Sequence, residues 1–351
     1  MKGFQKVAYI PHSKSMESAA DRRRFIFFAE NRNIEFEIYN PLKTYDLVYF
    51  SAGADITRYK EIKARGSKVI ADCVDSYFAD EKSIRGVFRN FAKFITRQNK
   101  YLVGNYAKYL KYRFFPNIDA VACGSAEYVL ALQQFSDNVH RIPDHCHNEV
   151  VRVKTTYKQW DTNLIHIAWK GLGSNIYQLN QLKKVFDQFS LTHDFVLHIV
   201  SQRTFYKYMN KYIKIDSLSV VKGLCKNICF HNWDDQTYSS IITKCDFAII
   251  PINESSPTAK NKPENKLINF WKMGMPVIAS PIDSYKRVMN ESGINLLCSS
   301  DSEWLEALKE LSNSEVFRES IGERVKKYSG RYYGKAVVLS QWDKLFTSIS
   351  S

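Results

Sequence analysis

The sequence contains no long run of apolar residues. A helix that crosses a bilayer needs about 20 consecutive apolar residues, and no stretch of the 351 residues approaches that length. The opening residues, MKGFQKVAYIPHS, also lack the apolar centre of a secretory signal peptide. We therefore expect a cytoplasmic protein without a membrane-spanning segment.

Cysteine is sparse and unpaired along the chain. The seven cysteines are an odd, scattered set, at positions 73, 123, 146, 225, 229, 245 and 298. A disulfide framework needs an even set, and a zinc site built from cysteine pairs needs two close pairs. Cys225 and Cys229 have no second pair beside them. We expect reduced thiols that serve packing, with no bound metal and no cofactor other than a substrate.

Short apolar strands alternate with helical stretches in both halves of the chain, so long irregular stretches are also scarce. The predicted strands are 6–10, 47–50, 69–72 and 120–123 in the first half, then 164–169, 195–200, 228–231, 247–251, 277–279 and 294–297. Such alternation is typical of the α/β class, in which a parallel sheet carries helices on both faces and binds ligands at the carboxyl ends of its strands. The length favours two domains, with a polar linker near residues 148–163.

Residues 245–281 form a strand, a loop, a helix and a returning strand, and they carry most of the functional signal. Pro263 is expected at the first turn of the helix, so the free amides of that helix would face the polar loop. A helix start of this kind attracts anions, and Lys262 and Lys266 lie beside it. The natural anion is a diphosphate, since a charge-assisted hydrogen bond contributes about 1.5–3 kcal/mol. Glu264 and Asn265 would present the helix amides.

This stretch of about 37 residues resembles the carboxy-terminal domain of GT-B glycosyltransferases, especially the large retaining family (family 4-like) that uses nucleotide sugars. The matching features are Cys245 and Asp246 after a helix, Pro251 at a strand end, Lys266 three residues before Asn269, and the run Gly274-Met275-Pro276-Val277-Ile278. The resemblance implies two Rossmann-like domains that face each other across a cleft. It places an acceptor domain at 1–150, a nucleotide-sugar donor domain at 163–334, and a final helix at 335–351 that packs on the first domain.

The sequence departs from the family at two positions. Members usually carry two glutamates, one for the donor sugar and one for the ribose hydroxyls, and Asn261 and Asn269 stand there instead. An asparagine amide still donates and accepts hydrogen bonds with hydroxyls. Glu264 is a nearby acid that can substitute for one of them. We therefore favour an active transferase with altered donor contacts over a catalytically silent relative that only binds.

A second phosphate-facing element is expected in the turn after strand 164–169. Lys170, Gly171 and Gly173 lie in this turn, and glycines allow a phosphate to approach the backbone closely. Lys170 would neutralise the diphosphate where family members often have arginine. The alternative is a tight turn without a ligand, and the sequence alone does not decide between them.

Acidic residues are absent between positions 82 and 115. This segment holds nine Lys or Arg residues and nine aromatic residues, in a chain whose net charge is +14. Its spacing predicts an amphipathic basic helix, which suits an anionic membrane face. The alternative is an ordinary helix whose aromatic residues are core and whose charges are solvated. Nucleic acid is a competing partner, but no recognised nucleic-acid motif appears, so we do not favour it.

These features together predict transfer of a sugar from a nucleoside diphosphate donor to a hydroxyl of a glycan or lipid-linked acceptor in surface polysaccharide synthesis. The resemblance implies retained anomeric configuration. Asp72 or Asp75, at the end of strand 69–72, is the candidate base, and Lys266 would stabilise the leaving diphosphate without a metal ion. The alternative within this fold is a non-hydrolysing sugar-nucleotide epimerase.

Overall fold

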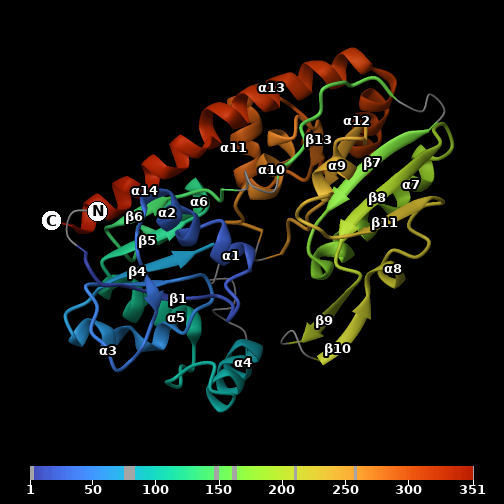
Figure 1. Ribbon diagram of the computed structural model, residues 1–351. Helices are drawn as coiled ribbons and strands as arrows, with labels where there is room; N and C mark the ends of the chain where they lie inside the picture. The colour runs from blue at the N-terminus through green and yellow to red at the C-terminus, as the bar shows by residue number, and fades with distance from the viewer. Residues whose placement is uncertain are drawn as a thin grey trace. The chain divides into compact units, whose positions relative to one another are not determined.

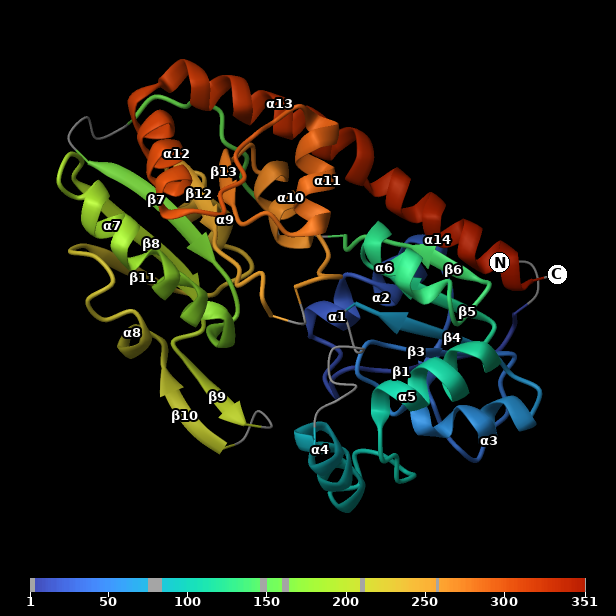
Figure 2. The same cartoon turned by 180° about the vertical axis from the view of Figure 1, so that it is seen from behind.

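The computed structural model describes residues 4–74, 84–145, 150–159, 164–208, 212–256 and 259–350. Contacts divide the chain into two units, shown from opposite sides in Figures 1 and 2. Unit 1 comprises Met1–His145, Ser256–Asn265 and Gly334–Ser351, and unit 2 comprises Cys146–Ser255 and Lys266–Tyr333. The segment 256–265, which the sequence analysis gave to the second domain, therefore belongs to unit 1.

Unit 1 is built on a parallel sheet of six strands in the order β2-β1-β3-β4-β5-β6. The strands are β1 Val7–Ile10, β2 Glu37–Ile38, β3 Leu47–Phe50, β4 Lys68–Cys73, β5 Ala120–Cys123 and β6 Val139–Arg141. Its helices are α1 Ala19–Arg22, α2 Phe25–Arg32, α3 Tyr59–Ala64, α4 Ile84–Ile95, α5 Tyr106–Tyr109, α6 Ala126–Leu132 and α14 Lys335–Ile349, with short turns η1 Ile56–Arg58, η2 Leu110–Phe114 and η3 Phe115–Asn117.

The two faces of this sheet bury two separate hydrophobic clusters, because successive side chains of a strand point to opposite faces. Tyr49 of β3 lies in one cluster, while its neighbours Val48 and Phe50 lie in the other. Helix α14 covers the first face with α2, and Trp342 of α14 stacks on Phe28 with ring centroids 5.4 Å apart. The last helix of the chain thus completes the core of the first unit.

Unit 2 has a parallel sheet of five strands in the order β11-β8-β7-β12-β13, and a separate antiparallel hairpin of β9 and β10. The strands are β7 Ile165–Lys170, β8 Phe195–Ser201, β9 Thr204–Tyr208, β10 Tyr212–Asp216, β11 Ile228–Asn232, β12 Phe247–Ile250 and β13 Val277–Ala279. Its helices are η5 Gly173–Leu182, α7 Lys183–Phe189, α8 Ser217–Val220, α9 Tyr238–Ile242, α10 Asn265–Lys272, α11 Asp283–Ser292, α12 Asp301–Asn313 and α13 Glu315–Tyr333.

The α/β class with two Rossmann-like sheets is confirmed. Three predicted strands, 47–50, 120–123 and 277–279, have the bounds of β3, β5 and β13. The predicted strand 294–297 forms only an isolated bridge between Leu297 and Ala279. The hairpin β9–β10 was not predicted, since lysine, threonine and aspartate interrupt its aromatic and aliphatic residues and leave no continuous apolar run.

The segment predicted as a linker is bonded to unit 2 where it is described. Lys154 is buried, and its Nζ donates to the backbone oxygens of Thr243 and Cys245 at 3.1 and 2.6 Å. The hydroxyl of Tyr157 donates to the Gly274 oxygen at 2.8 Å. Residues 150–159 are therefore a fixed strap on the second unit, because buried backbone and side-chain polar groups here have partners.

Helix α13 supplies a test of this strap. A methyl group on Gly322 would lie 2.0 Å from the Tyr157 hydroxyl, whereas nothing lies within 4 Å of the same position on Gly330. Glycine to alanine in a helix ordinarily stabilises by about 0.5–1 kcal/mol, but overpacking costs about 1–3 kcal/mol. We expect Gly322→Ala to lower the melting temperature and Gly330→Ala, in the same helix, to raise it. Equal shifts from the two variants, measured by calorimetry, would contradict the packing of the strap.

Candidate active site

The turn after β7 and the first turn of α10 meet at the carboxyl edge of the sheet of unit 2. Strands β7 and β12 are neighbours, so the segments that follow them emerge side by side. The Nζ of Lys266 lies over the ring of buried Trp169, 4.7 Å from its centroid. It also lies 3.0 Å from where a Cβ on Gly171 would be. The predicted residues Gly171 and Lys266, which are far apart in sequence, are therefore adjacent in the structure.

Lys170, the last residue of β7, is buried. Its Nζ donates to Asn269 Oδ1 and lies within 6 Å of three aromatic rings, those of Tyr238 at 5.0 Å, Phe270 at 5.3 Å and Trp233 at 5.6 Å. Aromatic faces attract a cation, more strongly when it is desolvated. Lys170 thus joins the end of β7 to α9 and α10, and the amide oxygen of Asn269 accepts from both Lys170 and the Tyr238 hydroxyl.

The backbone amides of the two predicted phosphate-binding glycines already have acceptors. Gly171 donates to the Val200 oxygen at 3.1 Å, which continues the ladder between β7 and β8. Gly173 donates to Oε1 of Gln202 at 3.0 Å. The Gln202 side chain is exposed, whereas the Val200 oxygen belongs to the sheet.

The predicted loop residues before α10 are held within unit 1. Ser125 donates to the Asn261 oxygen at 3.2 Å, and a Cβ on Gly124 would lie 3.0 Å from Pro263. Glu264 is fully buried, and its carboxylate accepts from Arg141 at 2.5 Å. A direct contact from Glu264 to a sugar would require this buried pair to separate. The partner, Arg141, was not anticipated, since a lone arginine in a short strand gives no local signal.

The candidate base Asp72 lies inside unit 1. Its side chain is 0% exposed, and Arg24 donates to both of its oxygens, at 2.7 and 2.9 Å. The Tyr49 hydroxyl donates to it at 2.8 Å. Burial lowers the pKa of the Arg24 guanidinium, but the charges of Asp72 and Asp144 outweigh it, so the pKa lies above its ordinary value. These contacts and the lack of exposed side-chain surface are those of a structural carboxylate. Asp75 lies outside the described residues.

Comparisons with known proteins add one finding to this geometry. No protein-family model matches the sequence, and no curated protein does. Among solved structures, the chain is similar to HepE from Anabaena, with 11% identity and a TM-score of 0.63 over 98% of this chain and 99% of that chain. WaaG, titled a glycosyltransferase involved in lipopolysaccharide biosynthesis, gives 11% identity and a TM-score of 0.54 over 97% and 99%. TarM from S. aureus gives 10% identity and a TM-score of 0.56 over 86% of this chain, which spans 55% of TarM.

The chain has the GT-B fold. This confirms the fold that the residues around Lys266 and Gly274 implied by resemblance. The carboxyl ends of β7 and β12 lie side by side at one edge of the second sheet. Lys266 and Gly171 are adjacent at that edge.

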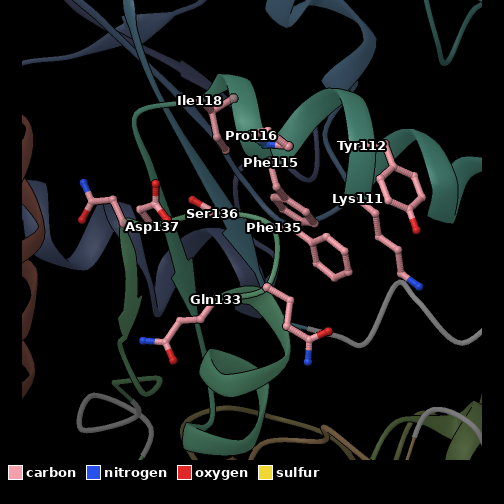
Figure 3. Close-up of a pocket in the computed structure, with 11 residues that line it drawn as sticks. Lys111, Tyr112, Phe115, Pro116, Ile118, Gln133, Phe135, Ser136 and Asp137 are labelled. Atoms are coloured by element: carbon pink, nitrogen blue, oxygen red, sulfur yellow. The ribbon is translucent and has the colours of Figure 1, made fainter.

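The GT-B chain also has a pocket in unit 1, with a volume of about 480 Å³. It is lined by η2, η3 and the residues after α6, and Figure 3 shows the side chains of Lys111, Tyr112 and Phe135 around it. Tyr112 and Phe135 pack edge to face at 6.1 Å, and Lys111 Nζ lies 5.6 Å from the Phe135 ring. None of the residues predicted for donor binding or catalysis lines this pocket.

Proposed function

We propose that this chain is a glycosyltransferase that takes its sugar from a nucleoside diphosphate donor held by unit 2. The observation that carries the proposal is the half-buried amine of Lys266 beside the Gly171 turn, at the carboxyl edge of a GT-B sheet. An ammonium at this edge pairs with phosphate oxygens through charge-assisted hydrogen bonds. Two similar structures are complexes with such ligands, HepE with UDP and glucose and TarM with UDP, which makes UDP the first probe to use.

In this proposal Lys266 stabilises the negative charge that grows on the leaving diphosphate. A fixed cation in a site that excludes water lowers the barrier by several kcal/mol, because it needs no reorganisation during the reaction. Lys262 and the amides near Glu264 and Asn265 add positive potential in the loop before α10. With these cations the transfer step needs no metal ion, and the anomeric configuration is retained as in the family that the sequence resembles.

Asparagines 261 and 269 have different parts in this proposal. Asn269 acts on the donor indirectly, because its oxygen holds Lys170 and Tyr238 in place. Asn261 is buried in unit 1 and presents its backbone oxygen to Ser125. The acceptor is a glycan or lipid-linked hydroxyl, and its deprotonation belongs to a group other than Asp72.

A thermal-shift panel tests donor binding. UDP, GDP and their sugars are compared with inorganic phosphate, and one nucleoside diphosphate at about a hundred times its dissociation constant should stabilise the protein by about 2.7 kcal/mol. Gly171→Ala should abolish this rise, because the added Cβ would lie 2.9 Å from buried Trp169 and 3.0 Å from Lys266 Nζ. Gly104→Ala is the control, since nothing lies within 4 Å of its Cβ position.

No shift with any nucleoside diphosphate, or the same shift in Gly171→Ala, would contradict the donor site. Analysis of the products formed from the sugar nucleotide that stabilises the protein then distinguishes sugar transfer from epimerisation at the same site. Transfer to an added glycan supports the proposal, whereas an epimerised donor in the absence of acceptor supports the epimerase.

We also propose that the segment 82–115 contacts an anionic membrane face, where a lipid-linked acceptor would be met. In the part of α4 whose side chains are described, Phe91 and Ile95 are 49% and 63% exposed. Leu110, Phe114 and Phe115 near the other end are core, whereas Tyr101, Leu102 and Tyr112 are 47%, 54% and 61% exposed. Across the described ranges, every helix is too short or too polar to cross a bilayer.

Vesicle sedimentation tests this contact. We expect binding to vesicles that contain phosphatidylserine and little binding to phosphatidylcholine alone, with loss at high salt, because each basic residue near the surface contributes about 1 kcal/mol. The double variant Phe91→Ser with Phe94→Ser should bind at least about tenfold more weakly, since it removes buried apolar area. Leu191→Ser, at an 82% exposed apolar residue of unit 2, is the control and should bind as the wild type does. Equal binding to both kinds of vesicle would contradict the proposal.

A further inference from the structure

Three histidines form a row across neighbouring strands of unit 2. His166 Nδ1 lies 2.8 Å from His198 Nε2, and His198 Nδ1 lies 3.1 Å from His231 Nε2. The parallel register places Cys229 of β11 directly beside His198 of β8. His231 follows Cys229 by two residues, so both side chains point to the same face of the sheet. None of these side chains has a part in the proposed donor site.

We propose that His198, Cys229 and His231 bind one divalent transition-metal ion of the Zn²⁺ class. One ligand atom from each residue lies within 4.8 Å of the other two, in the part of the chain that the structure describes. Two nitrogens bound at 2.0–2.1 Å to one tetrahedral ion are about 3.3 Å apart, close to the 3.1 Å between the His198 and His231 nitrogens. A thiolate with two imidazoles is a donor set that zinc and its neighbours favour over hard cations such as Mg²⁺.

Binding requires a defined movement of protons. The thiol of Cys229 loses its proton to solvent and binds as thiolate, and the facing nitrogens of His198 and His231 both present lone pairs. The ring that carries the proton of the hydrogen bond between those nitrogens transfers it, through solvent, to its own other nitrogen. Both rings are then neutral, with their protons on the nitrogens away from the ion. For His198 that nitrogen is Nε2, which lies 2.8 Å from His166 Nδ1 and would donate to it in the metal-bound state.

His166 is therefore a positioning residue for His198. A metal-bound histidine usually donates its other N–H to a fixed acceptor, which sets the tautomer and the ring orientation. His166 is itself fixed, because it is buried and its backbone amide donates to the Asp246 carboxylate at 2.8 Å.

The three ligands are partly exposed, which leaves the fourth position of a tetrahedral ion for water. Strand β11 is the edge strand of the sheet, and the ion would fasten it to β8. The chain continues from β11 to Trp233, whose ring stacks on Tyr238 at 4.7 Å. Metal binding would thus stabilise the strand that supports two of the rings around Lys170.

Cys225 and Cys229 were both predicted to serve packing, and Cys225 supplies the matched control. Its thiol lies 3.4 Å from the Asn227 oxygen, and burial raises its pKa to about 11. A zinc site of two cysteines would need Cys225, whereas the proposed site does not. His193, whose ring nitrogens lie near Thr192 and Asn313, is the corresponding histidine control.

Titration of the chelator-treated full chain with Zn²⁺ and Co²⁺ tests the proposal. We expect one equivalent of Zn²⁺ bound with a dissociation constant below about 1 µM, a higher melting temperature, and the thiolate-to-cobalt absorption band with Co²⁺. Cys229→Ser and His231→Ala should each weaken Zn²⁺ binding at least about tenfold, while Cys225→Ser and His193→Ala bind as the wild type does. The melting temperature of each metal-free variant checks that it is folded.

Wild-type binding weaker than about 1 µM would overturn the proposal and leave the three histidines as a hydrogen-bonded chain only. So would unchanged binding in the folded Cys229→Ser and His231→Ala variants. The cobalt band in the wild type reports the thiolate without any substitution, so the test holds even where a variant does not fold.

Discussion

Asp72→Ala is expected to lower the free energy of unfolding by about 3–5 kcal/mol, because it leaves the buried guanidinium of Arg24 without its main partner. The Asp72 side chain is inaccessible and accepts from Arg24 twice and from Tyr49 once. Asp144, at 3.3 Å from Arg24, compensates only part of the charge. Urea unfolding followed by circular dichroism measures the loss.

Asp343→Ala is the matched control. Asp343 also accepts twice from an arginine of the same region, Arg32, but the two side chains are 44% and 39% exposed. Exposed ion pairs contribute about 0–1 kcal/mol, so this variant should unfold nearly as the wild type does. A stable Asp72→Ala protein that binds donor but has no turnover would contradict the structural role and restore Asp72 as the catalytic base.

Lys266→Ala is expected to lower kcat/KM by about a hundredfold, since removing one preorganised donor from a transition state costs about 2.7–4 kcal/mol. The amine lies over Trp169 and beside Gly171, and α10 holds it there. The loss should appear mainly in kcat, because the charge on the diphosphate grows as the glycosyl bond breaks. Initial rates over a range of donor concentrations separate kcat from KM.

Lys260→Ala is the control for this variant, because Lys260 is an exposed cation of the same loop region. Its kcat/KM should stay within about twofold of the wild type, since exposed charges are screened by salt. Equal losses in the two variants would indicate general electrostatic attraction of the donor rather than a positioned amine.

The sequence predicted the fold well because its strongest signals are local. The apolar runs of β3 and β12 are continuous and short, which indicates buried strands, and both strands are fully buried. The resemblance around Gly274 gave the architecture, and that positive-φ glycine ends α10 where the pattern predicted. The run 294–297 was overestimated, since an apolar run reports burial and not hydrogen-bonded pairing.

The candidate site was predicted less completely, because its contacts join residues that are distant in sequence. Nothing local indicates that Lys170 is enclosed by Trp233, Tyr238 and Phe270, or that Asp72 is paired with Arg24. Lys170 and Asp72 were predicted as site residues because each lies at the end of a strand. A side chain at such a position can face a ligand or pair with a buried partner, and the sequence does not distinguish the two. The row of three histidines was not predicted for the same reason, since only the register of β7, β8 and β11 brings its members together.

The central claim is that Lys266 and the Gly171 turn hold the diphosphate of a sugar nucleotide. A crystal structure of the chain with UDP tests it most directly. We predict a β-phosphate oxygen about 2.7–3.2 Å from Lys266 Nζ, with the diphosphate at the carboxyl ends of β7 and β12. A diphosphate bound away from Lys266, with that amine still over Trp169 and in contact with no phosphate, would contradict the account.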